Sequence, residues 1–332
     1  MTDEPLSHET PQPSATLDLT RRKDSRPPAP PRRSIARGGR AAGPYVTMAR
    51  IAIGQLARSR FARVGVAVLA AIVFFAVFAD LLAGSPTQVS VDVLLPPLTR
   101  GHLLGTDAVG RDLFSRVVHG ARTALGLGLA GAMVLVALGV AIGALAGFVG
   151  GMLDSIVTRA VEALSAIPTL LLVLVVGATV EHPTAATLIW TIALTRWTEL
   201  ARLMRAEVLL VLGSDYVTAA RALGASPSRL LRRHVLPNAV GPAIVAAAFG
   251  VASIILAEAA VDFLRVGPPD TMASWGEALG EARGHAGAWW LIVFPGAALL
   301  ATLLSLNLIG EAARDALDPR LRMESPGSTL KM

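Results

Sequence analysis

The sequence contains no cysteine and only two lysines, Lys23 and Lys331. The lack of cysteine excludes disulfides, thiolate metal sites and cysteine nucleophiles, and it leaves the redox compartment undefined. Neither lysine lies in a G-x-x-x-x-G-K-[ST] phosphate loop, so the chain lacks that means of binding ATP. Any ATP-driven step that involves this chain would therefore need a separate ATPase.

Charged residues are also scarce. They make up 16% of the 332 residues, whereas 53% are hydrophobic and the mean hydropathy is +0.57. A soluble domain has about 25% charged and about 45–50% apolar residues. The net charge is +6, but the arginines cluster beside hydrophobic segments rather than among exposed aromatic residues. This distribution favours orientation in a bilayer over nucleic-acid binding.

Six segments are long and apolar enough to cross a hydrocarbon core, which takes about 20 residues. They lie near residues 64–82, 123–147, 163–180, 184–203, 239–259 and 288–309. The fourth segment is the weakest, because its uncharged part stops at Thr195 and is followed by Arg196 and Glu199. We therefore predict an all-α integral membrane protein with six transmembrane helices.

An even number of spans places both termini on one side of the membrane, and the positive-inside rule makes that side the cytoplasm. Arginines precede the first segment and fill the loop between the fourth and fifth: Arg50, Arg58, Arg60, Arg63, Arg202, Arg205, Arg221, Arg229, Arg232 and Arg233. Residues 1–45 are rich in Pro, Ser and Arg, which predicts a disordered cytoplasmic tail. Residues 312–332 are expected to form a cytoplasmic C-terminal tail.

The second segment carries Gly139, Gly143 and Gly147, and Gly151 continues the four-residue spacing. Such a stripe of small residues favours close helix packing over a pore lining. Pro168 and Pro295 fall at the start of the third segment and inside the sixth, where each can bend a helix.

Before the second segment, residues 103–125 combine helix-start residues with an apolar face. Thr106 and Asp107 are the start residues, and the apolar face contains Leu113, Phe114, Val117 and Val118. This pattern predicts a short amphipathic helix on the outer membrane surface.

Residues 216–237, on the basic side of the membrane, read as two short helices joined at a glycine. Asp215 can cap the first helix, and Gly224 suits the left-handed position that ends it. Ser226 followed by Pro227 suits the start of the second helix, and Pro237 is expected to close the unit. Ala219 and Ala220 leave the first helix with little bulk. A surface of this kind suits docking better than catalysis.

This segment resembles the cytoplasmic docking loop of ABC importer permeases. Five residues fall on the family pattern at the right spacing: Ala219, Ala220, Gly224, Leu236 and Pro237. Thr218 stands where the pattern has Glu, and His234 stands where it has Ile. The alternative is a basic amphipathic loop beside the membrane without a docking role, since cytoplasmic loops are generally basic.

Further stretches resemble one branch of these permeases, the second membrane subunit of dipeptide, oligopeptide and nickel importers. They are G-T-D-x-x-G-R-D-x-F-S-R at 105–116, AIPTLLLVLV at 166–175, Trp197 with Ala201, Arg202 and Arg205, SWGEAL at 274–279 and DALDPRLR at 315–322. Together they cover the chain from about residue 61 to 322. Arg265 departs from the pattern, since the branch usually has Gly there.

The resemblance implies a type I ABC importer permease fold with a cytoplasmic coupling helix. It divides the chain into a first transmembrane helix with an external segment (46–118) and a transmembrane domain of five helices with the docking loop 216–237 (119–311). The expected function is a permease subunit, not an enzyme, that passes peptides or a related small solute, nickel among the candidates. No cofactor is expected, because partner subunits bind the ATP.

The same resemblance implies partners and a location. The partners are a homologous second permease, two cytoplasmic ATPases and an extracytoplasmic solute-binding protein. The expected location is the bacterial inner membrane. The residues that touch the substrate are left unassigned.

Two other classes of protein are alternatives. An ion-coupled secondary transporter could use Arg196, Glu199, Glu258 and Asp262 as coupling charges, because ionisable groups inside a membrane are frequently functional. A membrane enzyme would need residues from the scattered His102, His119, His182, His234 and His285, yet no H-E-x-x-H, G-x-S-x-G or paired-carboxylate motif is present.

Overall fold

The computed structural model describes residues 59–180, 184–265 and 272–317. The predicted disordered tail 1–45 lies outside these residues, as does most of the predicted C-terminal tail. Within the described ranges the ordered elements are helices, and no named strand forms; two isolated β-bridges join Thr99 to His102 and Thr106 to Asp112.

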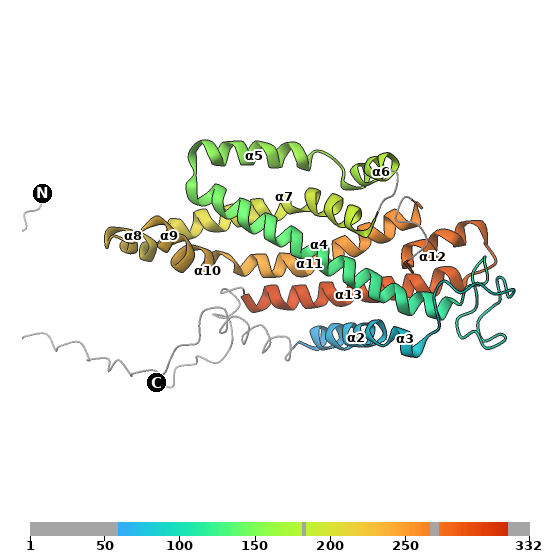
Figure 1. Ribbon diagram of the computed structural model, residues 1–332. Coiled ribbons are helices and arrows are strands. Elements are labelled where there is room, and N and C mark those ends of the chain that lie inside the picture. Colours follow the sequence, from blue (N-terminus) through green and yellow to red (C-terminus); the bar gives the residue numbers. More distant parts are fainter. Residues whose placement is uncertain (1–58, 181–183, 266–271, 318–332) are drawn as a thin grey trace, which may run out of the picture. The chain divides into compact units, whose positions relative to one another are not determined.

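In the part of the chain that the structure describes, six long or paired helical segments follow one another (Figure 1). They are α2 (Arg60–Val77) with α3 (Ala79–Leu82), α4 (Leu113–Val149), α5 (Gly151–Ser165) with α6 (Thr169–Thr179), α7 (Ala185–Leu212), α11 (Gly241–Phe263) and α13 (Trp290–Leu317). Helix α4 packs against α7 and α11, α11 packs against α13, and α13 packs against α2.

Short helices fill the connections on both sides of α11. The segment before it holds α8 (Asp215–Ala222), α9 (Pro227–Leu230), the π-helix η1 (Leu231–Val235) and α10 (Leu236–Ala239). The segment after it holds α12 (Trp275–Glu281) and the 3-10 helix η2 (Ala282–Gly284). Because α11 has 23 residues, it separates these two ends by about 34 Å, and Figure 1 shows them at opposite ends of the helix.

The prediction of a separate outer-surface helix over residues 103–125 is wrong. Helix α4 begins at Leu113, where the Asp112 carboxylate accepts a hydrogen bond from the Ser115 backbone N–H at 2.8 Å, and it continues for 37 residues. Thr106 and Asp107 are fully buried in the preceding loop and start no helix. The expected boundary between residues 118 and 119 therefore falls inside α4.

Among the described residues, four helices are individually long and apolar enough to cross a membrane: α2, α4, α11 and α13. The pair α5–α6 would be a fifth span, but its two helices meet at 77°. Helix α7 has 28 residues, yet its polar half carries Arg196, Glu199, Arg202, Arg205 and Glu207. The count of six spans thus stays a prediction.

The third predicted span, 163–180, is wrong as a single helix. Helix α5 ends at Ser165, and α6 starts directly after Pro168. With 11 residues, α6 is about 16 Å long, which is too short for a hydrocarbon core of about 30 Å. The expected bend at Pro168 is confirmed. At 77°, it divides the predicted span into two separate helices.

The glycine stripe of α4 packs against α7, as predicted. A Cβ added at Gly139 would lie 2.7 Å from the Leu200 Cβ, and one at Gly143 would collide with the Ala201 carbonyl. Gly151 does not belong to the stripe, because it begins α5 with φ +59° and has nothing within 4 Å of an added Cβ. The three remaining glycines let the two helix backbones approach closely.

Candidate functional site

The loop between α7 and α11 contains the two predicted helices, α8 and α9, with Gly224 between them. Gly224 has φ +82°, so the expected left-handed position is confirmed. The Ala225 N–H donates to the Ala220 carbonyl at 3.1 Å, and the Gly224 N–H donates to the Arg221 carbonyl at 3.0 Å. This pair of bonds is a Schellman motif, which satisfies carbonyls at the end of α8 and fixes the direction in which the chain leaves it.

The start of α9 also agrees with the sequence, since Ser226 occupies the N-cap and Pro227 the first turn. Asp215 was assigned wrongly: Ser214 is the N-cap, and Asp215 is the first residue of α8. Its carboxylate still lies in the first turn, where a negative charge complements the helix dipole.

Pro237 does not close the unit. The chain continues from α9 through η1 into α10, and Pro237 lies in the first turn of α10. Proline has no N–H to donate to the preceding turn, and the π-helix lies directly before α10. The docking loop therefore passes into α11 through helical turns rather than ending at a break.

The five pattern residues fall into two groups. Ala219 and Gly224 are exposed, and Ala220 is half-buried. Leu236 is half-buried and Pro237 is buried. The alanines and the glycine are thus available to another protein's surface, whereas Leu236 and Pro237 pack inside the chain. Their contact with an ATPase stays a prediction.

The docking loop is anchored in the main hydrophobic core. Val217 of α8, Leu230 of α9 and Val235 of η1 are 0%, 2% and 0% exposed. They belong to the same buried cluster as residues of the long helices: Leu135, Leu200, Met204, Val208, Val211, Ala243 and Ile254. Leu231, one turn before Val235, also packs against this cluster. Because close-packed side chains transmit displacement, a force on α8 reaches α4, α7 and α11.

The sequence reasoning missed two docking-loop residues. Val217 is the apolar anchor of α8, and the spacing of Val217, Leu230 and Val235 across the glycine turn is not periodic. Leu223, the C-cap residue of α8, is 89% exposed. Its position directly before the left-handed Gly224 was the feature of the sequence that could have indicated an exposed apolar side chain at this turn.

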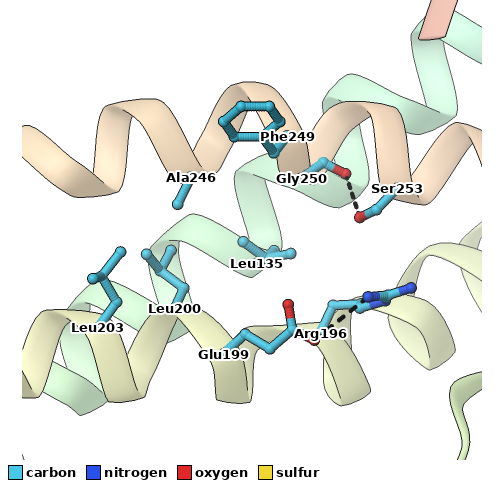
Figure 2. A pocket seen from close by; sticks show the side chains of 9 residues that line it. All are labelled: Leu135, Arg196, Glu199, Leu200, Leu203, Ala246, Phe249, Gly250 and Ser253. Atoms are coloured by element: carbon cyan, nitrogen blue, oxygen red, sulfur yellow. Dashed lines mark hydrogen bonds and ion pairs between the residues drawn. The ribbon is translucent and has the colours of Figure 1, made fainter. Parts of the chain in front are cut away.

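A hollow of about 310 Å³ lies between α7 and α11 (Figure 2). Its lining is mostly apolar, from Leu135, Leu200, Leu203, Ala246, Phe249 and Gly250, but it includes Arg196, Glu199 and Ser253. Arg196 and Ser253 also border a second hollow of about 190 Å³ beside Thr169 and Val173 of α6. The structure thus places Arg196 of α7 at the edge of both hollows and Glu199 at the edge of the first.

At the other end of the bundle, charged residues of the stretch 105–116 and of α12 meet in a buried ion cluster. Arg111 and Arg116 come from the loop before α4 and its first turn, and their partners are Asp107, Glu277 and Glu281. The Arg116 guanidinium lies 2.7 Å from Asp107 and 2.9 Å from Glu281, and it is 1% exposed.

Burial and charge act in opposite directions in this cluster. Burial raises the pKa of the Glu281 carboxyl, although Arg116 opposes the shift. Burial alone would lower the pKa of Arg111, but its hydrogen bond to Asp107 and the neighbouring carboxylates raise it above its ordinary value. The cluster joins α12 to α4, and the Trp275 indole N–H adds a hydrogen bond to the Val117 carbonyl at 2.8 Å.

Two of the proposed coupling charges lie near the C-terminal end of α11. Glu258 is 2% exposed and accepts a hydrogen bond from the Ser274 hydroxyl at 3.1 Å. Asp262 is one turn further along. Among the described residues, no group of three or more His, Asp or Glu side chains is arranged to hold a metal ion.

A bundle of apolar helices with a glycine-hinged, core-anchored loop at one end defines a multi-pass membrane protein. Comparison with known sequences identifies the class. Residues 139–323 match the family of binding-protein-dependent transport system inner membrane components, and residues 47–97 match the N-terminal transmembrane domain of oligopeptide transport permease C. The chain belongs to this family of permeases.

Individual relatives match over most of both sequences. A Brucella abortus protein named for a peptide transport system is 39% identical over 283 residues, which cover 85% of this chain and 94% of that protein. The di/tripeptide transport system permease of Pseudomonas aeruginosa is 39% identical, with 81% and 91% covered. The oligopeptide transport system permease of Bacillus subtilis is 35% identical, with 80% and 87% covered.

Membership confirms several predictions. The chain is a transmembrane permease subunit of an ABC importer, and ATP hydrolysis in such importers belongs to separate ATPase subunits. Importers of this family work with a second permease, ATPases and a solute-binding protein. Nickel as cargo and the ion-coupled alternative receive no support.

Proposed function

We propose that the chain is one of two permease subunits of a peptide importer in a bacterial inner membrane. The peptide assignment is supported by the relatives, which are named as permeases of peptide, di/tripeptide and oligopeptide transport systems. Substrates of this class are short chains that carry an ammonium and a carboxylate group.

In the proposed assembly, a homologous permease supplies the other half of the pathway, and each permease engages one of two cytoplasmic ATPases. This chain contributes the exposed face of α8, with Ala219 and Gly224, and its two termini lie in the cytoplasm. A solute-binding protein delivers the peptide at the opposite end, where α12 and the buried ion cluster lie.

The observation that best supports this function is the combination of an exposed docking surface with buried anchors on one short helix. Ala219 is exposed, while Val217, two residues earlier, is fully buried in the core that contains α7 and α11. When ATP binding closes the ATPase pair, the two docking loops are drawn together, and the shared core carries that displacement into the helices. The pathway then opens toward the binding protein, and hydrolysis resets it.

Transport by the purified assembly tests this function. The chain is co-purified with its second permease and ATPases, reconstituted in vesicles, and supplied with binding protein that carries a labelled dipeptide. We expect accumulation of dipeptide that requires ATP and stops when the ATPases are inactivated by mutation. Accumulation that persists with inactive ATPases, or ATP-driven transport of another solute without any peptide transport, would contradict the proposal.

A further inference from the structure

Two charged residues of α7, Arg196 and Glu199, lie near the middle of the helix and not at its end. Arg196 is 11 residues after the first residue of α7 and 16 before the last, which places it about 16 Å and about 24 Å from the two ends. Ser253 is 12 residues into α11, about 18 Å from the start of that helix. Arg196, Glu199 and Ser253, hereafter the α7–α11 polar site, therefore share a depth within the bundle and line one hollow.

The two charges of the site pair only loosely with each other. The Arg196 Nη1 donates to the Glu199 Oε1 at 3.5 Å, longer than the usual N–H···O bond. Among the described residues, the buried Arg196 Nε has no hydrogen-bond partner. The side chains of Arg196 and Glu199 are 32% and 66% exposed. Charges at this depth are too costly to leave facing lipid, so they face a water-filled path or another polar group.

The chemistry of the site matches the two ends of a short peptide. A guanidinium presents a planar set of donors that suits a carboxylate, and a carboxylate accepts from an ammonium. The Ser253 hydroxyl donates to the Gly250 carbonyl at 3.0 Å, which leaves its oxygen able to accept a hydrogen bond from a peptide N–H. Residues three apart on a helix have Cβ atoms about 5–6 Å apart, and an extended dipeptide spans about 7 Å.

The hollow is of a suitable size. Its volume of about 310 Å³ is at the small end of the range of about 300–1,000 Å³ for ligand pockets. Arg196 and Ser253 also border the second hollow, so cargo leaving one hollow remains in contact with the same polar groups. Apolar residues such as Leu203 and Phe249 form the rest of the wall. They offer no hydrogen bonds that would select particular side chains of the cargo.

We propose that the α7–α11 polar site binds the charged termini of peptide cargo in transit, with Arg196 receiving the carboxylate and Glu199 the ammonium. This inference rests on the proposed peptide function and deepens it. It makes Arg196 a substrate-binding residue that distinguishes a free C-terminal carboxylate from a blocked one. A dipeptide engages both charges, whereas the length of a longer peptide lets it place one end there at a time.

The test compares two cargoes that differ at one end. Binding protein is loaded with labelled alanyl-alanine or with its C-terminal amide, each complex is isolated, and uptake by the reconstituted transporter is measured. We expect Arg196→Gln to lower uptake of the free acid about 10- to 100-fold, the effect of losing a hydrogen bond to a charged group, and to leave uptake of the amide unchanged. The matched control is Arg202→Gln, an exposed arginine on the same helix that borders neither hollow; it should transport both cargoes as the wild type does.

ATP hydrolysis measured in the same vesicles separates binding from assembly. We expect Arg196→Gln to keep hydrolysis that the loaded binding protein stimulates. Equal loss of both cargoes, or no loss of either, would overturn the inference, and loss of hydrolysis together with all transport would make Arg196 a contact with the second permease. Failure of the wild type to move any peptide would instead refute the proposed function.

A second measurement leaves both charges in place. Because the chain has no cysteine, Ser253→Cys introduces the only thiol of this subunit. We expect a water-soluble thiol reagent to modify it, and modification to slow when the transporter turns over with alanyl-alanine. Leu194→Cys, at an exposed α7 position that borders neither hollow, should show no such protection. Equal rates with and without dipeptide at position 253 would contradict cargo binding there.

Discussion

Replacing Gly224 by valine tests the hinge of the docking loop most directly. Gly224 has φ +82°, a region that costs an L-residue about 1–2 kcal/mol and disfavours β-branched side chains most. No described residue lies within 4 Å of a Cβ added there, so the cost is backbone strain and not collision with a neighbour. The chain escapes the strain only by rotating out of the left-handed region.

That rotation breaks the two hydrogen bonds of the Schellman motif, Ala225 N–H to Ala220 and Gly224 N–H to Arg221. Strain at one such residue is of order 1–3 kcal/mol, and each 1.4 kcal/mol is about a factor of ten in population. We therefore expect the docking-competent arrangement of α8 and α9 to become about 10- to 100-fold less populated. The long helices, which do not depend on this turn, should still form and insert.

The assay is uptake per ATP hydrolysed in reconstituted vesicles, with co-purification of the ATPase as a second readout. Gly224→Val should insert normally, transport at least about tenfold more slowly and retain less ATPase. Gly224→Asn should come close to the wild type, because asparagine tolerates the left-handed region. Gly213→Val is the matched control, since Gly213 lies at the start of the same loop with φ −76° and only ordinary contacts at 3.6 Å or more. Wild-type uptake by Gly224→Val would refute the reasoning.

Three further predictions concern separate parts of the fold. Ala219→Trp should abolish co-purification of the ATPase, because the exposed face of α8 then carries a bulky ring; unchanged co-purification would show that no partner approaches it. Gly143→Val should destabilise the fold by about 1–3 kcal/mol through overpacking, because its Cβ meets the Ala201 carbonyl, and its melting temperature should fall. Gly126→Val, where an added Cβ has open space, should keep the wild-type melting temperature. Burial raises the pKa of the Glu281 carboxyl above its ordinary value of 4.5. The folded state therefore binds the carboxyl proton more tightly than the unfolded state does, and the stability that this adds is lost as pH rises through the raised pKa. Glu281→Gln should therefore flatten the fall in melting temperature with rising pH, and parallel curves for the two proteins would contradict this.

Much of the architecture could be predicted because the bilayer constrains it strongly. Apolar runs longer than the hydrocarbon core predicted four helices that the structure forms, within a few residues at most ends and up to ten residues short at the start of α4. Local chemistry predicted the left-handed glycine at 224 and the Ser226–Pro227 helix start, since both depend only on φ and on the donors of one turn. The spacing of Gly139, Gly143 and Gly147 likewise predicted a packing face.

The errors arise where a local signal competes with tertiary packing. Thr106 and Asp107 have the composition of a helix start, but the structure uses Asp107 to neutralise Arg111 and Arg116. Pro237 reads as a terminator, yet buried contacts on both sides of it keep the chain helical into α11. In the third predicted span, hydropathy could not reveal a 77° bend, because the hydropathy of a segment does not depend on the direction of its helix axis.

The sequence by itself determined the membrane class, the helical periods and the glycine turn, because each follows from solvation or from the dihedral angles of neighbouring residues. Only the tertiary structure decided which distant residues meet. Glu281 joins Arg116 across 165 residues, and Arg196 comes to one hollow with Ser253 of another helix. Such pairings depend on how helices pack and cross, and the periodicity of a single helix carries no information about its neighbour.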